Sequence, residues 1–271
     1  MAIIEGDIAE QKPSKYQMLS QKYHYVKDNY LKFLPRSPIS RLLIACQPIK
    51  WNLNVFKGSN RQVISELYYR RKNFSRLEDV QREADIDHQL KFLVKTESIE
   101  GDVLELGVYK GGTTTLFAHF LKKIKSKKKI FACDTFTGLP FDDEFSGYKD
   151  GKFKGWLSDT SYEYVIKKFQ EFKVDDKIIT TKGIFEEIVP QKLANEKFSF
   201  VLFDFDLYQS TLFALDFVYP RVPKNGIMVF QNYERIDKEN PVWGETKAVD
   251  EFFGAMGMKI DENPIPHFIK K

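Results

Sequence analysis

The sequence lacks the features that mark membrane, secreted and zinc-finger proteins. Its 271 residues contain no run of eighteen apolar residues that could cross a bilayer, and the acidic, polar start from Met1 to Glu10 is unlike a signal peptide. The two cysteines, Cys46 and Cys133, are far apart and have no metal-ligand spacing, which favours free thiols in a reducing compartment. We therefore expect a cytoplasmic protein with no transmembrane segment.

Nucleic-acid motifs are also missing, although positive charge is concentrated near the N-terminus. Residues 11–76 hold fourteen Lys or Arg but only two acids, Asp28 and Glu66. No zinc-finger, RNP or helix-turn-helix pattern accompanies this charge, so we predict no nucleic-acid partner. The segment suits a weak peripheral contact with an anionic membrane surface, or a solvated helical face that makes an oligomer contact in a homodimer.

Apolar strands alternate with helical segments beyond residue 76. This alternation predicts an α/β fold, a Rossmann-like doubly wound and mostly parallel sheet over residues 77–271, preceded by a basic, mostly helical N-terminal extension over residues 1–76. Two short segments, Met258–Ile260 and His267–Lys270, are expected to form a closing pair. The expected strands are Val103–Leu106, Lys129–Cys133, Lys177–Thr181, Phe198–Phe203 and Gly226–Phe230; the expected helices are Leu77–Lys95, Thr113–Lys125, Tyr162–Phe172, Ile184–Leu193, Thr211–Val218 and Thr246–Met256.

The stretch from Gly101 to Gly112, GDVLELGVYKGG, predicts a buried strand that ends in a tight turn and opens a helix. In an open parallel sheet, ligands bind at the carboxyl ends of strands, where glycine lets the backbone approach them. The spacing of Gly107 and Gly111 does not fit the G-x-G-x-x-G of a dinucleotide site, which argues against an oxidoreductase. Glu105 would repel a phosphate and suits a cationic ligand, and the E-x-G-x-x-x-G pattern resembles the S-adenosylmethionine loop of Rossmann-like methyltransferases.

A second acid, Asp134, ends the next expected strand, where a carboxylate can accept hydrogen bonds from ribose hydroxyls. A glycine-rich connection follows at residues 137–160, and its length is typical of a functional lid or of a disordered segment. Trp156 and Trp243 are candidates for a lid over an acceptor, and ordinary loop packing is the alternative. Aromatic faces suit sugar rings and adenine alike.

Five stretches together resemble the macrocin O-methyltransferases of the TylF type, which methylate hydroxyls of sugars in antibiotics and related glycans. They span residues 100–255 in the order of the family, whereas residues before 77 match less clearly. The resemblance implies a class I methyltransferase fold, S-adenosylmethionine as cofactor, and a small-molecule or glycan acceptor. The stretches are GDVLELGVYKGGTT, CDTFTGLP, FVLFDFDLYQST, LDFVYPRVPKNGIMVF and GETKAVDEFF.

The resemblance also implies roles for individual residues. The S-adenosylmethionine loop corresponds to Glu105, Gly107, Gly111 and Thr113, and the ribose and adenine side to Asp134, Thr135 and Phe136. In the family, the first Asp of the DxDLY motif, here Asp204, helps to hold a magnesium ion, and the second, here Asp206, is the proposed general base.

One departure from the family concerns the metal. The family's Asp-Asp-Tyr triplet after the following strand reads Gln231, Asn232 and Tyr233 here. Magnesium prefers carboxylate oxygens, and two neutral amides replace two of them, which argues against a tightly bound divalent ion. The alternative is a magnesium site in which an amide oxygen still ligates, with Asp206 or Glu234 as a substitute ligand. Without a metal a base must do more of the work, and Asp206 is the first candidate.

Alternatives remain open at this stage. Asp206 could be the N-cap of the helix that begins near Ser210, and His88 and His267 are other candidate bases. For the whole chain, we predict an S-adenosylmethionine-dependent O-methyltransferase that acts on a hydroxyl of a sugar or glycosylated small molecule. The alternative is a catalytically degenerate protein that binds the cofactor and acts as a partner or scaffold.

Overall fold

The structure is a computed structural model that describes residues 81, 83–147, 151–234 and 242–271. The chain divides into two units, Met1–Val55 and Phe56–Lys271, and all described residues belong to the second. The helices expected before residue 77, the basic segment and the boundary expected at residue 76 lie outside the described residues.

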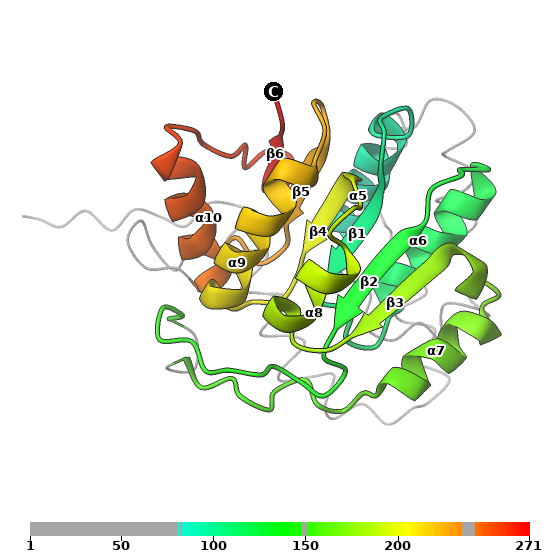
Figure 1. The fold of residues 1–271 in the computed structure, drawn as a ribbon, viewed down its shortest axis with the longest axis horizontal. Coiled ribbons are helices and arrows are strands. Elements are labelled where there is room, and N and C mark those ends of the chain that lie inside the picture. The colour runs from blue at the N-terminus through cyan, green and yellow to red at the C-terminus, as the bar shows by residue number, and fades with distance from the viewer. Residues whose placement is uncertain (1–80, 82, 148–150, 235–241) are drawn as a thin grey trace, which may run out of the picture. The chain divides into compact units, whose positions relative to one another are not determined.

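The described residues form a six-stranded sheet in the order β3-β2-β1-β4-β5-β6 (Figure 1). Strands β1 to β5 are parallel to their neighbours, and β6 is antiparallel to β5. The chain order reverses between β1 and β4, which is where doubly wound sheets bind their ligands. The strands are β1 (Asp102–Leu106), β2 (Ile130–Asp134), β3 (Ile178–Lys182), β4 (Phe198–Phe203), β5 (Ile227–Phe230) and β6 (His267–Ile269).

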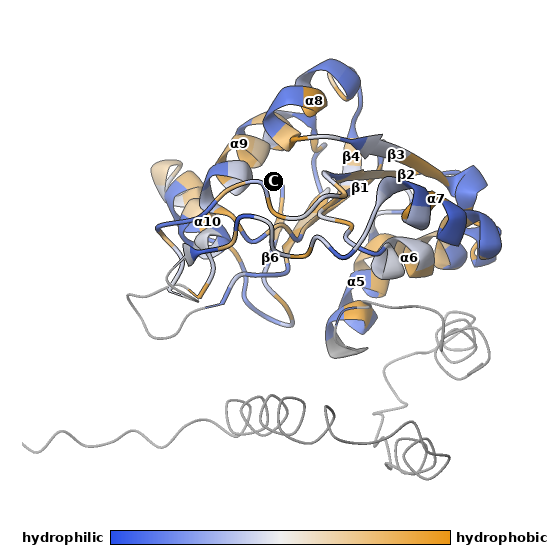
Figure 2. Ribbon diagram, turned by 90° about the horizontal axis from the view of Figure 1, so that it is seen from below, coloured by the Kyte–Doolittle hydropathy of each residue, from blue (hydrophilic) through white to orange (hydrophobic). Residues whose placement is uncertain are grey.

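Helices cover both faces of this sheet, as Figure 2 shows from the side. One face carries α5 (Glu83–Lys95), α6 (Gly112–Lys123) and α7 (Tyr162–Glu171). The other carries α8 (Phe185–Lys192), α9 (Tyr208–Val218) and α10 (Gly244–Ala255). The α/β doubly wound fold expected from the sequence is therefore confirmed. No helix within the described residues is long and apolar enough to cross a membrane.

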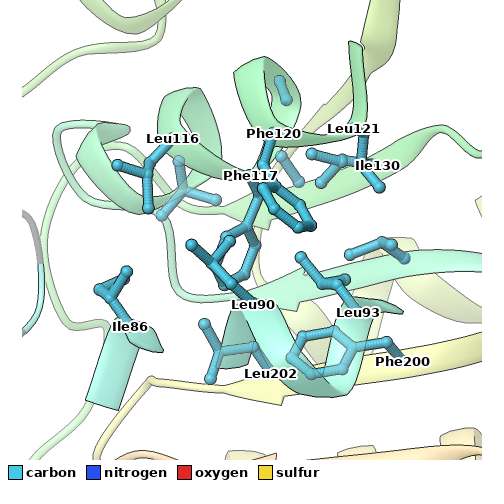
Figure 3. Close-up of a cluster of buried hydrophobic side chains, with 14 of the residues drawn as sticks. Ile86, Leu90, Leu93, Leu116, Phe117, Phe120, Leu121, Ile130, Phe200 and Leu202 are labelled. Atoms are coloured by element: carbon cyan, nitrogen blue, oxygen red, sulfur yellow. The ribbon is translucent and has the colours of Figure 1, made fainter. Parts of the chain in front are cut away.

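The core between α5, α6 and the sheet explains why most residues of β1 and β4 are apolar. Figure 3 shows Leu90 of α5 and Phe117 of α6 over Phe200 and Leu202 of β4. All four side chains are buried. Burial of such a side chain contributes about 1.5–3 kcal/mol, so this layer fixes α6, and with it the loop that opens α6, against β1.

The C-terminal strand does form, but the prediction that it pairs with Met258–Ile260 is wrong. Residues 258–260 form no strand, and β6 pairs with β5 through Ile269 opposite Ile227. Asp261 makes only an isolated bridge with His267. The parallel part of the sheet ends at β5, and the C-terminal strand β6 supplies hydrogen-bond partners for the outer backbone groups of β5.

Two helices begin earlier than expected, at Tyr208 instead of Thr211 and at Gly244 instead of Thr246. In α9, the added turn is stabilised by Asp143, whose Oδ2 accepts the backbone N–H of Tyr208 at 2.7 Å. Because this carboxylate comes from a distant loop, the local sequence of α9 does not show the cap.

Candidate functional site

A cavity of about 280 Å³ opens at the carboxyl ends of the parallel strands. Glu105 of β1, Asp134 of β2, and Asp204 and Asp206, which follow β4, all line it. The loop after β3 contributes Gly183. The carboxyl ends of parallel strands meet at one edge of a sheet, and so residues a hundred positions apart in the sequence face a common space.

The glycine turn after β1 is fixed by close packing against the loop after β4. Gly107 has a φ of 91°, and a Cβ added there would lie 2.0 Å from the backbone oxygen of Asp204. Gly111 has a φ of 75° and is the N-cap of α6, where a Cβ would lie 2.9 Å from the ring of Phe169. Gly107 lines the cavity together with Thr113, whereas Gly111 supports the turn from behind.

Asp134 organises the same turn. Its Oδ2 accepts the backbone N–H groups of Val108 at 2.7 Å and Tyr109 at 2.8 Å, and its Oδ1 accepts that of Phe136 at 2.6 Å. The residue also lines the cavity. A carboxylate that accepts several N–H groups holds the turn in one shape, which presents a preformed wall to a ligand.

The two residues after Asp134 have different surroundings. Thr135 lines the cavity, and its hydroxyl donates to the backbone oxygen of Gly138 at 2.7 Å. Phe136 does not line it: its side chain is 1% exposed and packs edge-on against Tyr162, with ring centroids 5.6 Å apart. The structure therefore places Phe136 in the core behind the cofactor side of the cavity.

Asp206, in the loop after β4, also lines the cavity. It is 8% exposed and has a φ of 63°, a left-handed conformation that is uncommon for any residue but glycine. The N-cap residue of α9 is Leu207, and the first backbone N–H of the helix is accepted by Asp143, so the alternative of Asp206 as N-cap is not supported. Strained backbone of this kind is concentrated at functional sites.

The two alternative bases lie away from the cavity. His267 belongs to β6, and its Nδ1 is 2.8 Å from the backbone oxygen of Ile265. His88 belongs to α5 on one face of the sheet. Neither histidine lines the cavity. Among the candidate bases, Asp206 is the one placed to meet a ligand.

Amide side chains surround Asp204. Its Oδ2 accepts the Nε2 of Gln81 at 2.5 Å, and its Oδ1 accepts the Nδ2 of Asn232 at 3.1 Å. Gln231 turns its Nε2 toward Asp85, with 3.2 Å between Nε2 and Oδ2. The described residues contain no group of three or more His, Cys, Asp or Glu side chains arranged to hold a metal ion. These residues do not fit a magnesium site, which needs oxygen donors and usually carboxylates.

A further acid, Glu245 in the first turn of α10, lies completely buried behind both aspartates. Its Oε1 accepts the backbone N–H of Asn232 at 3.0 Å. Burial raises the pKa of Glu245 well above its usual value, and the charges of Asp204 and Asp206 raise it further. This environment favours the protonated form of the carboxyl group.

The connection between β2 and α7 is ordered in its described parts and docked on the molecule. Figure 1 shows it in green below α8 and the tips of β2 and β3. Within it, the N–H of Leu139 donates to the backbone oxygen of Trp156 at 2.8 Å, and the N–H of Gly155 donates to that of Leu139 at 2.9 Å. Asp143 joins the connection to α9 as described above. Of the two expectations for this segment, the lid is the one that the described parts favour.

Aromatic side chains of this connection and of the segment before α10 face the cavity. Trp156 and Trp243 both line the cavity. The fully buried Phe153 packs against each of them, with ring centroids 5.6 Å from Trp156 and 5.7 Å from Trp243. Trp243 immediately precedes α10, and therefore the lid and α10 share one aromatic cluster.

The electrostatics of the cavity are one-sided. Four carboxylate side chains line it, and no Lys, Arg or His is present among its described lining residues. Such a wall favours a cationic ligand and hydroxyl groups, and it disfavours a pyrophosphate. It therefore opposes the alternative of a nicotinamide oxidoreductase.

Sequence reasoning missed several residues of this site. Gln81, Asp85 and Gln89 recur every four positions, and this spacing within an amphipathic stretch was an available signal for one polar helical face. For Glu245, its place in the stretch GETKAVDEFF was the available signal. Asp143 gave no comparable signal, because it is one of several acids in a long connection.

The comparisons with known proteins agree with this geometry. A family model described as macrocin-O-methyltransferase (TylF) matches residues 76–264. The 8-demethyl-8-(2,3-dimethoxy-alpha-L-rhamnosyl)-tetracenomycin-C 4'-O-methyltransferase of Streptomyces olivaceus is 25% identical over 154 residues, which are 53% of this chain and 58% of that protein. This chain thus matches little more than half the length of that relative.

Two solved structures share the fold. The O-methyltransferase NovP has a TM-score of 0.57 and 22% identity, with 69% of this chain and 78% of that chain covered. CalS11, a calicheamicin methyltransferase, has a TM-score of 0.57 and 18% identity, with 100% of this chain and 98% of that chain covered. At these identities the likeness extends to the fold alone.

Proposed function

Since this chain belongs to the macrocin O-methyltransferase family, we propose that it transfers a methyl group from S-adenosylmethionine to a hydroxyl of a sugar or glycosylated small molecule. One observation carries the proposal. A glycine turn flanked by Glu105 and Asp134 lines the same cavity as an acid in a left-handed conformation, Asp206. The turn with Glu105 and Asp134 suits the cofactor, and Asp206 suits an acceptor hydroxyl.

The residues present fit S-adenosylmethionine. When bound, this cofactor supplies an electrophilic methyl group on a positively charged sulfur. The acids at the ends of β1 and β2 match that charge and the ribose hydroxyls, and Gly107 lets the backbone approach the ligand. Thr113 and Thr135 add hydroxyl groups to the same wall.

Asp206 is the proposed general base. It would accept the proton of the acceptor hydroxyl as the oxygen attacks, a contribution typically worth about 10²–10⁴-fold in rate. Trp156 and Trp243 would cover the acceptor, exclude water and align the reacting atoms. Since the residues around Asp204 do not fit magnesium, the proposed mechanism uses no metal.

The test begins with calorimetric titration of the protein with S-adenosylhomocysteine, with magnesium and again with a chelator. The proposal expects binding in both conditions. A panel of sugar and glycoside acceptors is then assayed for methyl transfer under the same two conditions. Turnover that survives chelation and is lost in Asp206→Asn supports the proposal, and the absence of any cofactor binding would overturn it.

A second candidate function rests on the amides at Gln231 and Asn232, which stand where the family has acids. In this alternative the chain binds S-adenosylmethionine and acts as a partner or scaffold without methylating. Tight binding of S-adenosylhomocysteine together with no turnover of any acceptor would favour it. A homodimer through the basic N-terminal segment stays a prediction, because residues 1–76 lie outside the described residues.

A further inference from the structure

Four amide side chains connect two carboxylates beneath the acceptor side of the cavity. Gln81 and Asn232 donate to the two oxygens of Asp204, and Gln231 donates to Asp85. The fourth amide, Gln89 of α5, is fully buried and joins the two arms. We refer to Gln81, Gln89, Gln231 and Asn232 as the amide network.

The two carboxylates determine the direction of the hydrogen bonds in this network, because a carboxylate only accepts. Gln81 and Gln231 therefore present their Nε2 groups to Asp204 and Asp85 respectively. Their Oε1 atoms accept the Nε2 of Gln89 at 2.6 Å and 2.9 Å, while the buried Oε1 of Gln89 has no hydrogen-bond partner. Reversing the amide of Gln81 would bring its N–H groups against those of Gln89 and leave buried donors unpaired, at about 1–3 kcal/mol for each.

This arrangement decides what Asp204 can bind. A divalent ion must approach a carboxylate oxygen to about 2.0–2.1 Å and needs further oxygen donors around it. Here N–H groups, which carry partial positive charge, point at both oxygens of Asp204, and the oxygen of Gln81 is turned away toward Gln89. Donors occupy the positions that an ion and its other ligands would need.

We infer that the amide network takes the place of a divalent ion: Gln81 and Asn232 hold Asp204 in position by hydrogen bonds, and Asp204 is not a metal ligand. Gln81 and Gln89 are thereby positioning residues of the site. The inference deepens the proposed function but is independent of the methyl acceptor. It is tested by metal binding alone, so its failure and that of the proposed function are distinguishable.

The experiment measures Mn²⁺ binding by calorimetry and by the electron paramagnetic resonance signal of the free ion. The wild-type chain is compared with the double variant Gln81→Leu/Asn232→Asp, which removes one donor and replaces the other with an oxygen ligand. Asp204→Asn is added to both backgrounds. Gln191→Leu on α8, where the Gln191 side chain is exposed and donates to Glu187, is the matched control for the loss of a glutamine.

We expect no saturable Mn²⁺ binding at Asp204 in the wild type and in Gln191→Leu. In the double variant we expect affinity to rise at least about tenfold and to be lost again with Asp204→Asn, because ligand charge determines affinity. Saturable binding by the wild type that Asp204→Asn abolishes would overturn the inference.

A folded double variant that gains no Mn²⁺ affinity would also overturn it. Thermal unfolding and titration with S-adenosylhomocysteine establish that each variant is folded. If the double variant does not fold, the nearly isosteric single variant Asn232→Asp replaces it. That variant is also expected to gain Mn²⁺ affinity and to lose the gain when Asp204→Asn is added.

Discussion

The backbone N–H of Glu245 donates to the backbone oxygen of Asp206 at 3.0 Å. The first turn of α10 therefore holds the loop that follows β4. Asp206 has a left-handed backbone, which costs a non-glycine residue about 1–3 kcal/mol and persists only where surrounding contacts impose it. The position of the proposed base thus depends on a helix that begins far along the chain.

Replacing Asp206 by Asn is expected to lower methyl transfer by about 10²–10⁴-fold, because the amide cannot accept the hydroxyl proton. Affinity for S-adenosylhomocysteine should stay within a factor of about two, since the proposed cofactor contacts come from the glycine turn, Glu105 and Asp134 and not from Asp206. Asp216→Asn on the exposed face of α9 is the control. Full activity in Asp206→Asn would show that another group removes the proton.

Gly107→Ala should weaken binding of S-adenosylhomocysteine and destabilise the fold. The added Cβ would lie 2.0 Å from the backbone oxygen of Asp204, and a φ of 91° strains any other residue, so a loss of more than about 1 kcal/mol is expected. Gly254→Ala in α10, where a Cβ meets nothing within 4 Å, should instead stabilise by about 0.5–1 kcal/mol. Denaturant unfolding and calorimetry measure both effects, and wild-type values for Gly107→Ala would contradict the close packing.

Asp134→Ala removes the acceptor of three backbone N–H groups in and near the glycine turn. We expect affinity for S-adenosylhomocysteine to fall by about 10–100-fold, together with about 2 kcal/mol of stability, since the turn loses its fixed shape. Asp102→Ala is the matched control, because Asp102 accepts the N–H of Lys129 at 2.8 Å at the opposite end of β1. That variant should lose stability and keep its affinity; equal loss of affinity in both would contradict a local role for Asp134.

The pKa of Glu245 predicts how stability changes with pH. Burial, reinforced by the charges of Asp204 and Asp206, raises this pKa well above its usual value, so the folded state holds a proton that the unfolded state releases. The contribution of protonated Glu245 to the free energy of unfolding is fully present below about pH 4. It is lost as pH rises toward the folded-state pKa of Glu245, by at most about 1.4 kcal/mol per pH unit. Glu245→Gln should therefore flatten the decline of the free energy of unfolding above pH 5, as measured by denaturant titrations at several pH values.

Glu251→Gln on the same helix is the control for this pH dependence. Hydrogen bonds from Lys247 and from Tyr208 lower the pKa of Glu251, so its contribution to stability is present at neutral pH and lost as pH falls. Glu251→Gln should therefore weaken the loss of stability at low pH, whereas Glu245→Gln weakens the loss of stability at high pH. An unchanged pH profile in Glu245→Gln would mean that Glu245 is ionised in the folded state.

The sequence alone predicted the fold and one edge of the site. The strands over Val103–Leu106 and Phe198–Phe203 were predicted to within one residue at each end, because buried parallel strands are continuous apolar runs between turn signals. The predicted strands also place the four acids of the site, since each acid stands at or just past the carboxyl end of its strand. These acids are Glu105, Asp134, Asp204 and Asp206. The rules of parallel sheets bring such positions together whatever connects them.

Only the tertiary structure decided which neighbours these acids have. Phe136 is adjacent in sequence to a residue of the cavity wall and yet packs in the core. Gln81 precedes the predicted motifs and Glu245 lies in the last of them, and both meet the aspartates after β4. Hydrogen bonds between segments so far apart leave no local pattern in the sequence. Packing of α5 and α10 against the sheet creates them, and so the choice between a metal ion and an amide network at Asp204 is made by the fold.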